Sequence, residues 1–269
     1  MKQILFIFSI LLILQGCKNE PKDQIVVIKT EFGDMKIKLY NETPRHRDNF
    51  IRLAKDGFYN NLLFHRVINE FMIQGGDPDS KSAKPGEQLG EGGPGYELPA
   101  EIHFPQLFHK KGVIAAAREG DRVNPEKKSS GSQFYIVQGK IFNDEELDKI
   151  EERINGMKKS QIYYLLMTEH KDSLMTLQKK GKFDEFTAMQ QRIKDEAEQK
   201  YNEQTKYTIP ENIREVYRTV GGTPHLDTNY TVFGEVIEGL NVIDSIVAVD
   251  TDPNNRPVKD IKMTVEIVK

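Results

Sequence analysis

The hydrophobic pattern near the start of the folded region is that of paired strands. After residue 24, the run IVVIKTEFGDMKIKLY contains two β-rich stretches on either side of Phe-Gly-Asp, which predicts a hairpin. In the second stretch Met35, Ile37 and Leu39 alternate with lysines, the period of a strand with one buried face. We therefore expect the domain to begin with a β-hairpin.

The next segment, TPRHRDNFIRLAKDGFY, has the spacing of an amphipathic helix. Thr43 is a candidate N-cap and Pro44 suits the first helical position, while Gly57 supplies a C-terminal stop. The expected buried face consists of Phe50, Leu53 and Ala54.

Short strands separated by loops rich in glycine and proline follow this helix. The expected strands lie around Leu63–Val67, Phe71–Gln74, Gly112–Ala117 and Phe134–Val137. The loop GEGGPGYELPAE lacks the lysine and the following helix of a phosphate-binding loop. It is therefore interpreted as a structural turn.

Residues 143–218 have a different composition, which is rich in Glu, Lys, Gln, Leu and Met. Asn143 followed by Glu146 resembles a capping box at the start of a helix. Gly156 is expected to break or kink that helix, and Gly181 to mark a turn between helices. With a last short helix over residues 210–220, the segment predicts an α-helical hairpin or small bundle.

Strand signals return at residues 219–269, so the helical segment interrupts a single β-rich domain whose first part is residues 25–142. The run LNVIDSIVAV predicts a short helix, and IKMTVEIV predicts a closing strand. The inward positions of the helix are expected to be Leu240, Ile243, Ile246 and Val247. Those of the strand are expected to be Ile261, Met263, Val265 and Ile267.

The first 17 residues have the pattern of a secretory signal: a basic start, a short apolar run and small residues. The end of this segment, LQGC, resembles the lipobox of bacterial lipoproteins, in which the cysteine carries the lipid. The sequence therefore predicts lipidation of Cys17, a polar tether over residues 18–24, and a membrane anchor in the cell envelope, facing the periplasm. An ordinary secretory signal with an incidental cysteine is the alternative.

Composition narrows the possible functions. A chain of 269 residues with 38% hydrophobic and 29% charged residues suits a globular domain. The formal net charge of −3 comes without a basic stripe, which argues against nucleic-acid binding. The six histidines are not arranged as a metal site, and we expect neither a metal nor another cofactor.

The candidate chemistry lies in FHRVINEFMIQGGD, where Arg66 stands among apolar residues. No neighbouring carboxylate makes it part of an evident acid/base pair. The motif therefore raises the question of which reaction uses a permanent positive charge beside an apolar surface and needs no proton shuttle.

Four segments in order, FHRVINEFMIQGGD, KGVIAAAR, GSQFYIV and HLDTNYTVFGEV, resemble the cyclophilins, the peptidyl-prolyl cis-trans isomerases. The resemblance covers Gln24 to about Phe142 and Gly221 to Lys269. It implies a mainly β fold: a closed eight-stranded antiparallel barrel capped by two helices, here with an inserted α-helical subdomain. It also implies binding of proline-containing, unfolded or flexible polypeptides.

The same resemblance implies roles for individual residues. Arg66 would donate to the prolyl nitrogen, with Gln74 beside it as a second catalytic residue. Gln74 and Gln133 would contact the substrate backbone or orient Arg66, while the backbone at Ala117 and Arg118 would pair with the peptide. The proline pocket would consist of Phe71, Met72, Tyr135 and Leu226. The remaining substrate-binding residues would be His65, His225 and Tyr230, with His65 and Tyr230 at the rim. Tyr135 replaces a usual phenylalanine, so its hydroxyl needs a partner.

Three functions fit these motifs to different degrees. A lipid-anchored prolyl isomerase that assists folding of envelope or secreted proteins is favoured by the arginine and glutamines. The alternatives are a binding module or chaperone with little turnover, and a structural lipoprotein whose barrel has lost its catalytic activity. The insertion is either a decorative hairpin or an arm that contacts clients or an envelope partner.

Overall fold

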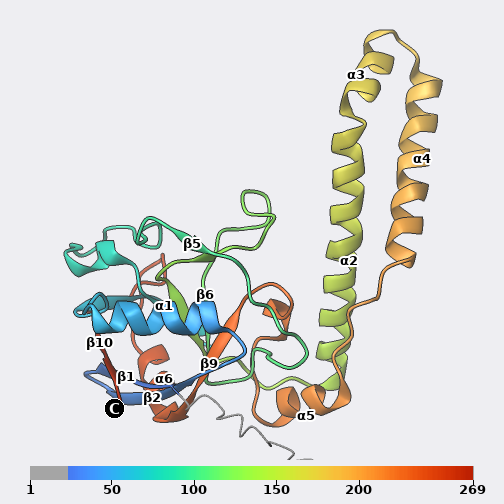
Figure 1. Cartoon of the computed structure of the whole chain (residues 1–269). Helices are drawn as coiled ribbons and strands as arrows, with labels where there is room; N and C mark the ends of the chain where they lie inside the picture. The colour runs from blue at the N-terminus through green and yellow to red at the C-terminus, as the bar shows by residue number, and fades with distance from the viewer. Residues whose placement is uncertain (1–23, 269) are drawn as a thin grey trace, which may run out of the picture.

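The computed structural model describes residues 24–268, which form a β-barrel with a long helical arm at one side (Figure 1). Eight strands close the barrel in the order β1-β10-β3-β4-β8-β6-β9-β2, and all neighbouring pairs are antiparallel. Their bounds are β1 (Gln24–Thr30), β2 (Gly33–Leu39), β3 (Leu62–Ile68), β4 (Met72–Gly75), β6 (Val113–Ala116), β8 (Phe134–Val137), β9 (Val232–Glu238) and β10 (Lys262–Ile267). The closed antiparallel barrel predicted from the resemblance is confirmed.

The expected hairpin is formed by β1 and β2, which pair from Gln24 opposite Leu39 to Thr30 opposite Gly33. The alternating residues Met35, Ile37 and Leu39 are fully buried in the barrel core, as predicted. A separate two-stranded ladder, β5 (Glu97–Leu98) with β7 (Ser129–Ser130), was not predicted. Strands of two residues are too short to show a hydrophobic period.

Helix α1 (Pro44–Lys55) caps the barrel and buries its predicted face, Phe50, Leu53 and Ala54. Its end is also as predicted, because Gly57 follows it with a φ of 69°. Thr43 occupies the N-cap position, as predicted, although its side chain makes no capping hydrogen bond. The Thr43 side chain is instead buried.

The second cap, α6 (Leu240–Val247), buries Ile243, Ile246 and Val247 as expected. Leu240 is 43% exposed, and the prediction that it points inward is wrong. It lies in the first turn of the helix, where its side chain sits close to Gly112 at the barrel edge. Val242, 3% exposed, fills the interior position instead.

The arm rises from the barrel as a hairpin of helices (Figure 1). Its elements are α2 (Asp144–Glu169), α3 (Lys171–Lys179), α4 (Phe183–Asn202) and, at the base, α5 (Glu211–Thr219). Asn143 and Glu146 form the predicted capping box, and Gly181 provides the turn before α4 with a φ of 67°. Helix α2 continues through Gly156, so the predicted break is wrong. One glycine costs a helix only about 1 kcal/mol, which packing against α4 can offset.

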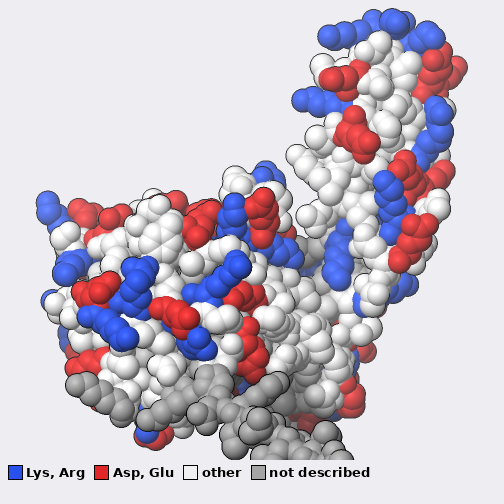
Figure 2. Space-filling model, in the orientation of Figure 1, with Lys and Arg blue, Asp and Glu red and all other residues white. Residues whose placement is uncertain are grey.

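Two hydrophobic clusters hold the arm together. The root cluster joins the arm to the barrel loops that carry Phe104 and Phe108, and consists of Phe142, Leu147, Ile154, Tyr207, Ile209, Ile213 and Tyr217. The distal cluster consists of Leu166, Leu174, Ile193 and Ala197. None of the helices within residues 24–268 combines the length and hydropathy that crossing a bilayer requires. Basic and acidic side chains intermix over the face in Figure 2.

Candidate active site

Nine of the twelve predicted site residues of the barrel line one cavity of about 170 Å³, here called the Arg66 cavity. Its floor is apolar and buried, with Met72 1%, Tyr135 5% and Leu226 9% exposed. The complete lining is Arg66, Phe71, Met72, Gln74, Ala117, Arg118, Tyr135, Leu226 and Tyr230. The predicted site residues that do not line it are His65, Gln133 and His225.

Strand register explains why these residues meet. Arg66 on β3 lies opposite Gln74 on β4, and Gln74 lies opposite Tyr135 on β8. The three side chains therefore form one row across adjacent strands, on the outer face of the barrel. Neighbouring positions such as Ile73 and Ile136 face the opposite side and belong to the barrel core, because successive side chains alternate along a strand.

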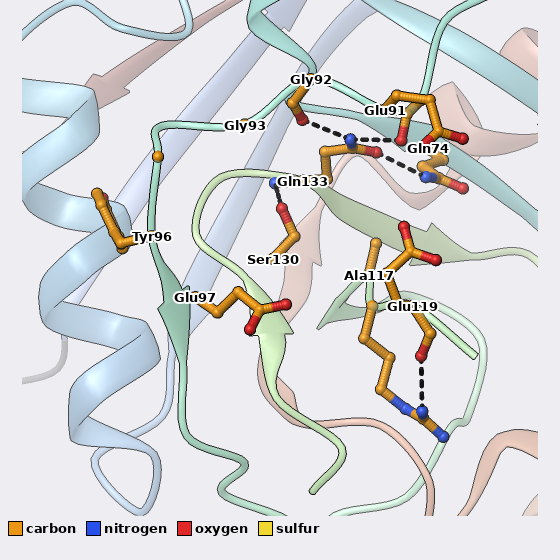
Figure 3. A pocket seen from close by; sticks show the side chains of 13 residues that line it. Gln74, Glu91, Gly92, Gly93, Tyr96, Glu97, Ala117, Glu119, Ser130 and Gln133 are labelled. Carbon is orange, nitrogen blue, oxygen red and sulfur yellow. Dashed lines mark hydrogen bonds between the residues drawn. The ribbon is translucent and has the colours of Figure 1, made fainter. Parts of the chain in front are cut away.

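A chain of side-chain hydrogen bonds holds the guanidinium of Arg66. Arg66 Nη1 donates to Gln74 Oε1 (3.2 Å), and Gln74 Nε2 donates to Gln133 Oε1 (3.0 Å). Gln133 Nε2 in turn donates to the carbonyl oxygens of Gly90 (2.8 Å) and Gly92 (2.7 Å), as Figure 3 shows for the glycine loop. This chain fixes the orientation of both amides. Other N–H groups of Arg66 are left to donate to a ligand.

The electrostatic setting of Arg66 matches the chemistry predicted for it. The Arg66 cavity has no carboxylate and no histidine in its lining. Burial lowers the pKa of Arg66, but a guanidinium remains charged at physiological pH. Its carbon Cζ lies 6.0 Å from the centre of the Phe71 ring, close to the apolar wall.

The hydroxyl of Tyr135 has a buried partner that the sequence did not predict. It donates to His109 Nε2 (2.9 Å), and His109 Nδ1 donates to Asp227 Oδ1 (2.8 Å). The other oxygen of Asp227 accepts from the hydroxyls of Tyr217 (2.7 Å) and Tyr207 (3.4 Å). This Asp227 network connects the root of the arm to the floor of the Arg66 cavity. Burial raises the pKa of Tyr135 well above its ordinary value, so the hydroxyl stays protonated.

The two predicted histidines occupy different surroundings. His65 is 4% exposed and lines neither the Arg66 cavity nor its neighbours, so its expected place at the rim is wrong. On β3 it lies between Phe64, which belongs to the barrel core, and Arg66, where a register irregularity interrupts the regular alternation of side chains. Burial lowers the pKa of His65 to about 4. His225 stacks on Phe71, with 5.5 Å between the ring centres.

Comparison with known proteins identifies the family. The model of the family "Cyclophilin type peptidyl-prolyl cis-trans isomerase/CLD" matches residues 25–158 and 172–267, most of the chain. The chain is a cyclophilin. It is therefore a peptidyl-prolyl cis-trans isomerase, an enzyme that interconverts the two isomers of X-Pro bonds.

Similar proteins agree with this assignment. A Staphylococcus saprophyticus protein assigned by name to the peptidyl-prolyl cis-trans isomerases is 30% identical over 254 residues, covering 93% of each chain. A Staphylococcus aureus protein with the same name is 29% identical over 238 residues, covering 88% of this cyclophilin and 87% of the relative.

The fold has a solved counterpart in a cyclophilin of Cryptosporidium parvum. That structure has a TM-score of 0.53 and 20% identity, and the match covers 92% of this chain and 98% of the other. A second structure of the Cryptosporidium protein was determined in the presence of the dipeptide Ala-Pro.

This cyclophilin has a second, more polar cavity of about 400 Å³ that shares Gln74, Ala117 and Arg118 with the Arg66 cavity (Figure 3). One wall is the glycine-rich loop that the sequence indicated only as a structural turn. A Cβ at Gly92 would clash with the carboxylate of Asp77, which is fully buried. The cavity could have been found only from the contact of this loop with Gln133, which is distant in sequence.

The backbone expected to pair with a peptide is partly occupied. The N–H of Ala117 donates to the carbonyl of Gln133 (3.0 Å), and its carbonyl accepts from Ser130 (2.8 Å). Both main-chain polar groups of Ala117 are therefore already paired within the protein. The Arg118 side chain is fixed by bonds to Asn229 O (2.7 Å) and Asp121 Oδ1 (2.6 Å). Within residues 24–268, no group of three His, Cys, Asp or Glu side chains is placed to hold a metal.

Proposed function

We propose that this cyclophilin isomerises X-Pro bonds by donating from the Arg66 guanidinium to the prolyl nitrogen of the twisted amide. A peptide bond resists rotation because the nitrogen lone pair is delocalised into the carbonyl. When the bond twists, the lone pair returns to nitrogen, and a fixed donor stabilises that state. The observation that carries the proposal is a charged donor, held by Gln74 at 3.2 Å, in a cavity lined without carboxylates.

The substrate is a proline-containing, unfolded or flexible polypeptide. Its proline ring occupies the Arg66 cavity against Phe71, Met72 and Leu226, and its backbone extends along Gln133 and the main chain of Arg118. The apolar wall holds the ring while the acyl side turns. Support comes from the size and lining of the cavity and from the Ala-Pro dipeptide used with the Cryptosporidium cyclophilin.

NMR exchange spectroscopy on an Ala-Pro peptide tests the role of Arg66 without a coupling protease. The wild-type protein should accelerate exchange, and Arg66→Ala should lower kcat/KM roughly a hundredfold, as expected for loss of one preorganised donor. The fold should survive, because Arg66 lines a cavity outside the barrel core. Near-normal exchange by a folded Arg66→Ala protein would reject the mechanism.

A non-catalytic proline-binding module or chaperone is the second candidate, favoured by the arm. It predicts that peptide binding, measured by titration, greatly exceeds any acceleration of exchange. It also predicts that Arg66→Ala leaves the protection of unfolded clients unchanged.

The proposed place of action is the cell envelope, through a lipid on Cys17. Cys17, the signal segment and the tether to residue 23 lie outside the described residues, so the support is the LQGC sequence after a short apolar run. A lipoprotein cysteine with two or three acyl chains gives stable attachment, which one chain does not. Mass spectrometry of the mature N-terminus should show lipidated Cys17. A soluble product beginning elsewhere would exclude the anchor.

The proposed task is folding of envelope or secreted proteins, with the arm contacting clients or an envelope partner. Tyr164 and Leu165 on α2 and Phe183 on α4 are 64%, 59% and 66% exposed. Tyrosine and leucine side chains on the distal arm can contact unfolded chains through their apolar surface. A decorative hairpin remains the competing interpretation.

A further inference from the structure

A third cavity lies where the barrel meets the base of the arm, and Figure 2 shows the surface hollowed between these two regions. Its volume is about 480 Å³, against about 170 Å³ for the Arg66 cavity. Leu226, Tyr230 and Val123 line it from the barrel side, and Ile150, Ile154 and Met157 line it from α2. We call it the arm cleft.

The arm cleft is continuous with the site already described. Arg118, Leu226 and Tyr230 line both the arm cleft and the Arg66 cavity. His225, which stacks on Phe71 of the Arg66 cavity, also lines the arm cleft. Because an extended chain advances about 3.3 Å per residue, residues within a few positions of a bound proline reach the cleft.

The walls of the cleft have a defined chemistry. Val123 and Met157 expose 73% and 57% of their surface, so the cleft presents apolar area on both of its walls. Two of its cations, Arg122 and Arg153, have no ion pair with any of residues 24–268, whereas Arg118 pairs with Asp121 (2.6 Å). An apolar surface edged by unpaired guanidinium groups is complementary to an apolar side chain with a carboxylate beside it.

We infer that the arm cleft is a specificity subsite that binds a large apolar side chain, next to an acidic residue, in the segment flanking the isomerised proline. The inference rests on the proposed function, since it assumes that the proline occupies the Arg66 cavity. It assigns substrate contact to the base of the arm, which is distinct from the exposed surface of the distal half.

Peptides that differ in one flanking position test the subsite. Each peptide contains one Ala-Pro core, and one of the four positions on either side of the core is either Phe or Ser. The residue next to that varied position is either Glu or Gln. Affinity is measured by calorimetry and kcat/KM by NMR exchange. At the position that reaches the cleft, Phe should exceed Ser roughly tenfold in both, the effect of burying a large apolar side chain. Glu should exceed Gln by a few-fold at low salt, and this gain should shrink at high salt.

Two variants link the preference to the cleft. Met157→Asp places a charge on its apolar wall and should reduce the Phe-to-Ser ratio towards one. Val258→Asp is the matched control, because Val258 is 70% exposed and lies outside all three cavities. It should keep the full ratio. Arg153→Ser should remove the preference for Glu over Gln and leave the preference for Phe.

The inference is overturned if no flanking position distinguishes Phe from Ser, or if the full ratio survives both Met157→Asp and Val123→Asp. Failure of the Arg66 mechanism gives a different result. In that case exchange is insensitive to Arg66→Ala, while calorimetry on the same peptides still reports whether the cleft selects Phe.

Discussion

The root of the arm and its distal half differ in what they pack against. Tyr217 at the root is fully buried among barrel loops, and its hydroxyl binds Asp227 in the network beneath the Arg66 cavity. Tyr164, on the distal half of α2, is 64% exposed. The distal cluster has residues from α2, α3 and α4 alone. An ion pair between Lys159 and Glu198 joins α2 to α4 between the two clusters.

This difference shows that one end of a helical insertion can be required for the stability of the domain, while the other end can be removed without affecting it. Deletion of all residues 143–218 would remove Tyr207 and Tyr217 and leave the buried Asp227 carboxylate with fewer donors. A buried charge that loses its hydrogen bonds is strongly destabilising. The root of the arm therefore contributes to the stability of the barrel, although it lies in the inserted sequence.

The largest expected effect is on stability at the root. Tyr217→Ala should lower the free energy of unfolding by about 3–5 kcal/mol, because it opens a cavity and removes a donor to Asp227. Tyr164→Ala, the same change at a 64% exposed position, should cost less than about 0.5 kcal/mol. Denaturant unfolding of both variants measures this. Equal costs would remove the distinction between root and distal half.

A fall in pH should lower the stability of the barrel. His65 in the barrel is 4% exposed with its pKa lowered to about 4, and burial also lowers the pKa of His46. Below the ordinary pKa of about 6.5, the unfolded chain binds a proton at His65 that the folded chain does not. Stability should therefore fall as pH falls from about 6.5 to 4, by about 3 kcal/mol for His65.

Thermal unfolding at several pH values measures this loss. His65→Gln should reduce the pH dependence by the His65 share and leave that of His46 and His225, whose pKa values burial also lowers. The same change at the exposed His103 should leave the pH dependence unchanged. An unchanged slope in His65→Gln would show that another group titrates.

The smallest expected effect follows removal of the distal half. Lys159 and Glu198 are in contact, so a short Gly/Ser linker can replace residues 160–197 and keep the root cluster. Turnover of a small X-Pro peptide should stay within about twofold, because the Arg66 cavity is untouched. Catalysed refolding of a proline-limited protein should slow a few-fold if the distal arm contacts clients. Equal refolding rates would favour the decorative interpretation.

Sequence patterns predicted what depends on local order. The strand alternation of Met35, Ile37 and Leu39 and the capping box at Asn143 involve residues close in the chain, and both are present. Arg66 and Gln74 came from one contiguous motif, and the strand register places them opposite each other.

What the sequence missed depends on contacts between distant segments. The Asp227 network unites five residues from four regions: His109, Tyr135, Tyr207, Tyr217 and Asp227. No local period marks such a cluster. The exposure of Leu240 and the continuity of α2 through Gly156 were likewise decided by tertiary surroundings.

The most direct test of the central claim is kcat/KM of Arg66→Lys on an Ala-Pro peptide, measured by NMR exchange beside the wild type and Arg66→Ala. Lysine keeps the charge but lacks the planar fork that Gln74 and the cavity hold in place. The account predicts that Arg66→Lys stays within about tenfold of Arg66→Ala, far below the wild type. Near-wild-type turnover by Arg66→Lys would contradict it, because charge alone would then be sufficient.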